Sequence, residues 1–234
     1  MFSFYANPTR FLRLRERLSP WLLLLSLAGL GAGIIWGLFF SPPDYQQGET
    51  VRIMYLHVPF AWMSMFCYAW LAGSAALYLI YTHRLADLFA QAFARVGAVL
   101  TLLCLVTGSI WGKPTWGTWW VWDARLTSVL LMFFLYIAYC LLRAREESGK
   151  RAAILALLGA VNLPVIKFSV DWWNTLHQPA SISRLSSPAI HPDLLWPLLL
   201  CASGLLALTL WLCMAWVETL WREARVLRRE AQHD

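Results

Sequence analysis

The stretch LLWPLLLCASGLLALTLWLCMAWV, residues 194–217, carries no charged side chain. A helix needs about 20 mainly apolar residues to cross the hydrocarbon of a bilayer, and this stretch supplies them. Five other stretches of the chain approach or exceed the same length. The predicted membrane spans are residues 20–40, 55–82, 92–112, 126–142, 152–171 and 194–217.

The composition supports a lipid environment. Apolar residues make up 59% of the 234 residues and charged residues only 14%, whereas a water-soluble domain is about one quarter charged. A closed β-barrel is the other way to span a bilayer, but its short alternating strands are absent from the sequence. The sequence therefore predicts an all-α integral membrane protein with six transmembrane helices, folded as a single domain over residues 1–234.

The positions of arginine and lysine predict the orientation, because these residues concentrate on the cytoplasmic side of a membrane. Most of them flank the spans on the side of both termini: Arg10, Arg13, Arg15, Arg17, Arg84, Arg95, Arg143, Arg145, Lys150, Arg151, Arg222, Arg225, Arg228 and Arg229. The opposite side carries Arg52, Lys113, Arg125 and Arg184. We therefore expect both termini in the cytoplasm. The net charge of +6 does not indicate a nucleic-acid partner, since the basic residues lie in separate short runs.

The segment WGKPTWGTWWVWDARLT, residues 111–127, lies on the predicted outer side and holds five tryptophans in its first twelve residues. Tryptophan is common at membrane interfaces, but an interfacial belt spreads over several helix ends instead of filling one loop. The glycines and the proline between residues 108 and 117 are expected to interrupt the helix and to let a flat partner or another backbone approach closely.

Beginning at Trp116, the residue spacing predicts a short helix along the membrane interface, with an aromatic face and an acidic edge. That aromatic shelf consists of Trp116, Trp119, Trp120 and Asp123, and Trp122 widens it. Such a surface suits a flat, apolar, polarizable ligand.

Two histidines lie at the same predicted depth as this segment. His57 and His177 are near the outer ends of different spans. Each alone is equally well explained as a locally hydrogen-bonded interfacial residue. Together they are more informative, because neutral imidazole is a common metal ligand and haem iron takes protein ligands on opposite faces of the ring.

Charged residues on the outer side are further candidates. Arg52 and Arg125 have the fork geometry that suits the carboxylates of a macrocycle, but they are equally well explained as loop charges or as partners of nearby carboxylates. Lys167 and Asp171, near the outer end of the fifth span, have no assigned role, and a local role is expected for His191.

These residues resemble the CcmC family, the haem-handling WWD-motif membrane proteins of cytochrome c maturation. The signature is matched by WGKPTWGTWWVWDARLTS, and it is flanked by YLHVPFAWMSM and VDWWNTLHQPAS. The resemblance extends from about Asp44 to His177 and includes the layout of six spans.

The resemblance implies a protein that is not an enzyme and that holds haem b at the periplasmic face of the bacterial inner membrane. It implies His57 and His177 as the axial ligands of the iron. The WWD residues would present haem to the chaperone CcmE; here they are Trp116, Trp119, Trp120, Trp122 and Asp123. The expected partners are the ABC-transporter subunits CcmA and CcmB, the small subunit CcmD and the lipid bilayer.

Two other functions stay open at this point. A membrane electron-transfer cytochrome b would also need two histidines, although its ligands usually lie well within the spans. A haem transporter would move haem through its own bundle, and transporters tend to carry midplane sites on broken helices. Only the kink predicted at Asn162 and Pro164 favours the transporter.

Overall fold

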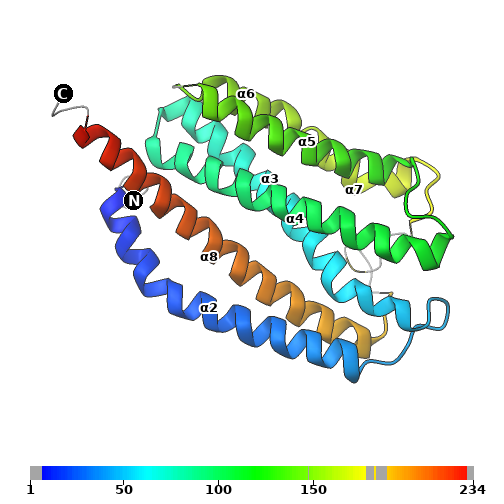
Figure 1. The fold of residues 1–234 in the computed structure, drawn as a ribbon. Coiled ribbons are helices and arrows are strands. Elements are labelled where there is room, and N and C mark those ends of the chain that lie inside the picture. The colour runs from blue at the N-terminus through cyan, green and yellow to red at the C-terminus, as the bar shows by residue number, and fades with distance from the viewer. Residues whose placement is uncertain (1–6, 147, 178–181, 183–188, 231–234) are drawn as a thin grey trace.

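Figure 1 shows the computed structural model, a bundle of helices in which the described residues are 7–146, 148–177, 182 and 189–230. The helices are α2 (Pro8–Phe39), α3 (Met54–Tyr81), α4 (Arg84–Trp116), α5 (Ala124–Arg145), α6 (Lys150–Gly159), α7 (Asn162–Trp172) and α8 (Pro192–Glu230), and the 3₁₀ helix η1 (Glu49–Ile53) leads into α3. Within the described ranges there is no β-strand. Arg184 lies outside the described residues.

The predicted six spans are confirmed. Six helical segments are long and apolar enough to cross a membrane, and they coincide with the six stretches found in the sequence. Helices α6 and α7 together form the fifth of them. The helix breaks between Gly159 and Asn162, as the predicted kink requires, and the Asn162 side chain donates a hydrogen bond to the carbonyl of Ser128 on α5 at 2.8 Å. The protein is therefore an all-α, multi-pass membrane protein.

The six spans give the bundle two ends that differ in content. The start of α2 and the end of α8 lie together at one end, which we call the termini end (Figure 1). The turns at residues 40–48 and 117–123 and the segment after α7, residues 173–177, lie at the opposite end, which we call the tryptophan end (Figure 1). The predicted cytoplasmic position of the termini stays a prediction.

Helix α2 packs mainly on α8, antiparallel to it (Figure 1). Contact between the two backbones depends on glycine, because a Cβ added at Gly29 would lie only 2.8 Å from the Cα of Gly204. One turn further along α2, a Cβ at Gly33 would lie 2.7 Å from the backbone nitrogen of Cys201. Nearer the termini end, the Trp211 indole donates to the hydroxyl of Ser19 at 2.8 Å.

Helices α3, α4 and α5 form the centre of the bundle. Tyr136 of α5 is fully buried, and its hydroxyl donates to the carbonyl of Ser64 on α3 at 2.7 Å. Its ring meets the ring of Tyr68 edge-on, with 4.9 Å between the centroids. Tyr136 also packs on Gly97 of α4, where an added Cβ would collide with its ring, so one side chain joins all three helices.

Helix α4 is longer than predicted at both ends. It begins at Arg84 instead of residue 92 and runs to Trp116, so the expected interruption between residues 108 and 117 is wrong. The helix ends where Gly117 adopts a φ of +78°, a left-handed conformation that glycine adopts without steric cost. The short interfacial helix predicted from Trp116 is also wrong, because residues 117–123 form a non-helical connection to α5.

Candidate functional site

His57 lies in the first turn of α3, at the tryptophan end, and faces α4. Its Nδ1 is 3.1 Å from the carbonyl oxygen of Cys104 and 3.1 Å from the hydroxyl oxygen of Thr107. A carbonyl oxygen only accepts hydrogen bonds, so Nδ1 carries the proton and Nε2 keeps its lone pair. The His57 ring also meets the ring of Trp111 edge-on, with centroids 5.6 Å apart.

Gly108 makes room for this imidazole. A Cβ added there would lie 2.8 Å from Cε1 of His57, closer than real Cβ contacts allow. The sequence interpretation took this glycine for a helix breaker. In the structure it lets a side chain of α3 pack directly on the backbone of α4.

His177 lies five residues beyond the end of α7, in a non-helical segment. Its Nδ1 is 3.0 Å from Oδ2 of Asp123, and its backbone N–H donates to the hydroxyl of Thr175 at 2.9 Å. The His177 ring meets the ring of Trp116 edge-on, with centroids 4.8 Å apart. A carboxylate also only accepts, so the proton again sits on Nδ1 and Nε2 keeps its lone pair.

Asp123 contacts both the start of α5 and the segment that carries His177. Its Oδ1 accepts a hydrogen bond from the backbone N–H of Leu126 at 2.7 Å, which caps the start of α5. Its Oδ2 faces His177, and only 5% of the side chain is exposed. Burial lowers the pKa of His177 below its ordinary value, although the hydrogen bond to Asp123 acts in the opposite direction. The lowered pKa favours the neutral ring, the state in which it can bind a metal.

Both histidines contact one face of α4, His57 directly and His177 through the ring of Trp116. Residues 104, 108, 112 and 116 recur every four positions and so lie along one side of the helix. Cys104 and Gly108 contact His57, while Gly112 gives room to the ring of Trp116, which contacts His177.

The four tryptophans of the WWD segment do not form the flat shelf that was predicted. Trp116 and Trp120 are half-buried, whereas Trp119 and Trp122 are 57% and 76% exposed. The rings of Trp120 and Trp122 meet at 76° instead of lying in one plane. The rings of Trp116 and Trp120 therefore contact the protein, and the rings of Trp119 and Trp122 face the surroundings.

The Trp120 indole nitrogen is buried and has no hydrogen-bond partner in the described part of the chain. The hydroxyls of Tyr55, Tyr68 and Thr209 share this property. Trp120 differs from them because it lies in the connection between α4 and α5, three residues before Asp123, which contacts His177. A buried N–H without an acceptor costs free energy, so it is suited to an acceptor on a ligand.

The structure gives the two candidate arginines protein partners. The Arg52 guanidinium donates to the carbonyls of Gly37, at 2.9 Å, and Leu38, at the end of α2, and pairs with Glu49. Arg125 donates to the hydroxyl of Ser169 at 3.1 Å and to two carbonyls of α7 at 3.4 Å. Their predicted contact with haem carboxylates stays a prediction.

The remaining outer residues make local contacts. His191 is exposed, and its Nδ1 accepts a hydrogen bond from the backbone N–H of Asp193 at 3.3 Å.

A hollow of about 290 Å³ lies beside the His177 segment, and it is lined by Val121, Trp122, Asp123, Asn174, Thr175 and Leu176.

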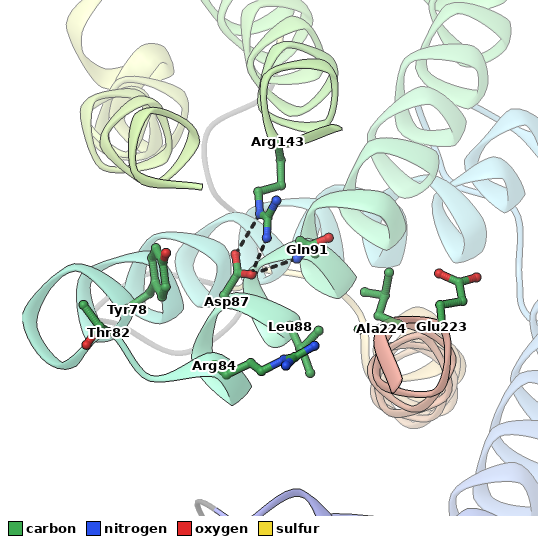
Figure 2. A pocket seen from close by; sticks show the side chains of 10 residues that line it. Tyr78, Thr82, Arg84, Asp87, Leu88, Gln91, Arg143, Glu223 and Ala224 are labelled. Atoms are coloured by element: carbon green, nitrogen blue, oxygen red, sulfur yellow. Dashed lines mark hydrogen bonds and ion pairs between the residues drawn. The ribbon is translucent and has the colours of Figure 1, made fainter. Parts of the chain in front are cut away.

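A larger hollow of about 490 Å³ lies at the termini end, between α3, α4, α5 and α8 (Figure 2). Its floor carries the buried carboxylate of Asp87. Arg143 donates to both oxygens of that carboxylate, at 3.0 and 2.7 Å, and Gln91 donates to one of them at 3.0 Å (Figure 2). These charged groups satisfy one another, so both oxygens of the Asp87 carboxylate are already engaged.

The donor set at the tryptophan end fits haem better than a bare metal ion. No group of three or more His, Cys, Asp or Glu side chains suited to a metal ion occurs among the described residues. Haem needs fewer protein ligands, because its macrocycle already supplies four nitrogens and the protein adds one axial ligand on each face. His57 and His177 have the chemistry for those two positions.

Comparison with known proteins adds a family to this geometry. A family model described as CcmC, heme exporter protein C, matches residues 1–233. The chain belongs to this family.

Individual members of the CcmC family align with most of the chain. Heme exporter protein C of Haemophilus influenzae is 50% identical over 214 residues, which are 90% of this chain and 87% of the relative. Heme exporter protein C of Escherichia coli K12 is 48% identical over 196 residues, 82% of this chain and 80% of the relative. A putative cytochrome c biosynthesis ccmC-like mitochondrial protein of Marchantia polymorpha is 50% identical over 176 residues, 75% of this chain and 76% of the relative. The predicted resemblance is confirmed.

The sequence interpretation missed the residues of α4 that support the histidines. Cys104, Thr107 and Gly108 surround His57, and Gly112 supports the contact to His177 through Trp116. The four-residue spacing of the two glycines and Trp116 was the available signal. It indicated one continuous helix face, not a break.

Proposed function

We propose that the protein binds haem b at the tryptophan end of the bundle, with His57 and His177 as axial ligands of the iron, and delivers it to the haem chaperone CcmE during cytochrome c maturation. This end of the bundle then faces the periplasm, and the protein resides in the bacterial inner membrane. CcmA, CcmB and CcmD are its further partners. Haem is cargo in this proposal, and no covalent step is assigned to the chain.

One observation carries the proposal. Two histidines from different segments lie against α4 and its last residue, Trp116, and each uses Nδ1 for an oxygen acceptor while Nε2 has no described partner. A hydrogen bond from the second ring nitrogen is typical of metal-bound histidine, because it fixes the tautomer and the orientation of the ring. The names of the family and of its relatives, which refer to haem export and cytochrome c biosynthesis, support the choice of haem.

The outer residues have a role in the transfer. The exposed rings of Trp119 and Trp122 offer apolar surface to the acceptor protein. The half-buried ring of Trp116 contacts His177, and the half-buried ring of Trp120 contacts the ring of Trp122. The buried indole N–H of Trp120 is placed to donate to an acceptor group of the cargo, such as a carboxylate.

The first experiment is the absorption spectrum of the detergent-purified protein with each histidine replaced in turn. His57→Ala and His177→Ala are each expected to lower haem retention and to shift the haem bands. His191→Ala is the matched control, because His191 lies at the same end but is exposed and bonded to Asp193. Spectra of His57→Ala or His177→Ala that match the unsubstituted protein would remove that residue from the ligand set.

A second experiment separates delivery from electron transfer and from transport. Haem-loaded protein is mixed with purified CcmE, and the haem bound to CcmE is measured. If the unsubstituted protein does not transfer haem to CcmE, and quinol rapidly reduces its haem, these results would support an electron-transfer cytochrome instead. Substitutions at the α6–α7 break test transport. If they abolish haem delivery while the absorption spectrum of the haem held by His57 and His177 stays unchanged, the result would support transport through the bundle.

A further inference from the structure

The two histidines are held in unequal ways. His57 belongs to α3, its Nδ1 has two acceptors on α4, and Gly108 lets its ring pack on the α4 backbone. His177 belongs to no helix. Among the described residues, its ring is held by one hydrogen bond, to Asp123, and by the edge contact with Trp116. Removing one acceptor from His57 leaves another, whereas removing Asp123 leaves His177 with no described acceptor.

The position of Asp123 makes this difference important. Its carboxylate lies at the start of α5 and is fixed there by the backbone N–H of Leu126 at 2.7 Å. The same carboxylate therefore fixes His177, which belongs to no helix, to the start of the membrane span α5. A residue that orients a metal ligand in this way changes metal affinity by about 10- to 100-fold when it is replaced.

We propose that Asp123 is the positioning residue for His177 and that His177 is the replaceable iron ligand, which leaves first during handover while His57 stays bound. This inference rests on the proposed haem function and adds to it the order in which the ligands exchange. In that exchange the bond between iron and Nε2 of His177 breaks, and its electron pair stays on the imidazole. The incoming ligand supplies its own lone pair, so the oxidation state of the iron does not change.

The test uses two substitutions of Asp123 that keep its role as the cap of α5. Asparagine and serine both cap helix starts well, so Asp123→Asn and Asp123→Ser preserve the cap of α5. Neither supplies a carboxylate to His177, and serine is also too short to reach it. Thr107→Val is the matched control on the other ligand, because it removes one acceptor of His57 and leaves the carbonyl of Cys104.

The measurement is the rate at which carbon monoxide binds to the reduced haem of the purified, full-length protein, together with its spin state by absorption and resonance Raman spectroscopy. Carbon monoxide binds a six-coordinate haem only after one axial ligand has left. We expect the rate to rise about tenfold or more in both Asp123 variants, with a larger five-coordinate fraction. Thr107→Val is expected to raise the rate by less than either Asp123 variant, since one acceptor of His57 remains.

A double substitution identifies the ligand that leaves. If Asp123 acts through His177, then His177→Ala and His177→Ala/Asp123→Asn bind carbon monoxide at the same rate, because nothing remains for Asp123 to position. Equal rates in the unsubstituted protein and both Asp123 variants, or an equal rise in Thr107→Val, would overturn the inference. A six-coordinate spectrum that persists in His57→Ala and His177→Ala would instead overturn the proposed function, so the two failures are distinguishable.

Discussion

At the termini end, the buried carboxylate of Asp87 accepts from Arg143 with both oxygens and from Gln91 with one (Figure 2). At the tryptophan end, His57 and His177 each engage Nδ1 and leave Nε2 without a described partner. Both clusters are polar, both are largely buried, and both join different segments of the chain. The two clusters differ in whether their donor and acceptor atoms all have partners. A cluster that satisfies all its members stabilises the bundle, whereas a cluster that leaves atoms without a partner is suited to a ligand.

The largest expected effect comes from the termini end. Asp87→Ala leaves the Arg143 guanidinium without its carboxylate in a partly buried site, and breaking a buried pair in this way costs about 3–5 kcal/mol. We expect that loss in unfolding experiments on the detergent-purified protein. Haem absorption is expected to stay unchanged, because about 30 Å of α4 separate Asp87 from Gly108.

The double substitution Asp87→Ala/Arg143→Met serves as the control for Asp87→Ala. It removes both charges, so part of the lost stability is expected to return. A changed haem spectrum in the folded Asp87→Ala protein would contradict the separation of the two ends.

A second prediction concerns the glycine that makes room for His57. Gly108→Ala places a Cβ 2.8 Å from Cε1 of the imidazole, so the ring must move. We expect haem retention to fall about 10- to 100-fold, the range seen when the support of a metal ligand is disturbed. The measurement is haem dissociation to a soluble acceptor such as apomyoglobin.

Gly73→Ala, in α3, is the control for that substitution, because a Cβ there meets no atom within 4 Å. It is expected to leave haem retention unchanged and to leave the helix equally or more stable. Equal haem loss in the two variants would mean that helix flexibility, not the contact with His57, controls retention.

The smallest expected effect comes from the unused indole N–H at the tryptophan end. Trp120→Phe keeps an aromatic ring and removes a buried donor that has no described partner. The haem-free protein is expected to be equally or more stable, since the cost of the unsatisfied group disappears. Haem retention is expected to fall about two- to tenfold, the value of one hydrogen bond. Lower stability of the haem-free variant would show that the N–H already serves the fold.

The sequence predicted the spans well because span length and apolar content are local properties. It placed the start of α4 too late, since Asp87, Gln91 and Arg95 look like loop residues when they are considered alone. In the structure Asp87 pairs with Arg143, and the Arg95 guanidinium lies 5.4 Å from the ring centroid of Trp216. Partners from α5 and α8 keep these polar residues inside a helix, and no local pattern contains that information.

The candidate site could be predicted only in part for the same reason. His57 and His177 lie at the same end of the bundle, which the topology already indicated. Their Nδ1 partners were not predictable, because Cys104 contributes a backbone carbonyl and Asp123 was interpreted as the acidic edge of a helix. The predicted helix from Trp116 was wrong because Gly117 ends α4 and Asp123 starts α5, which leaves the tryptophans between them in a connection.

The glycine contact between α2 and α8 has a consequence for biosynthesis. Among the six spans, α2 comes first in the chain, yet its main packing surface belongs to α8, the sixth. Helix α2 must therefore remain in the bilayer without this partner until the five later spans have been translated. The bundle closes only when Gly204 meets Gly29, so nascent chains truncated before α8 should leave α2 accessible to crosslinking by lipid or by other membrane proteins.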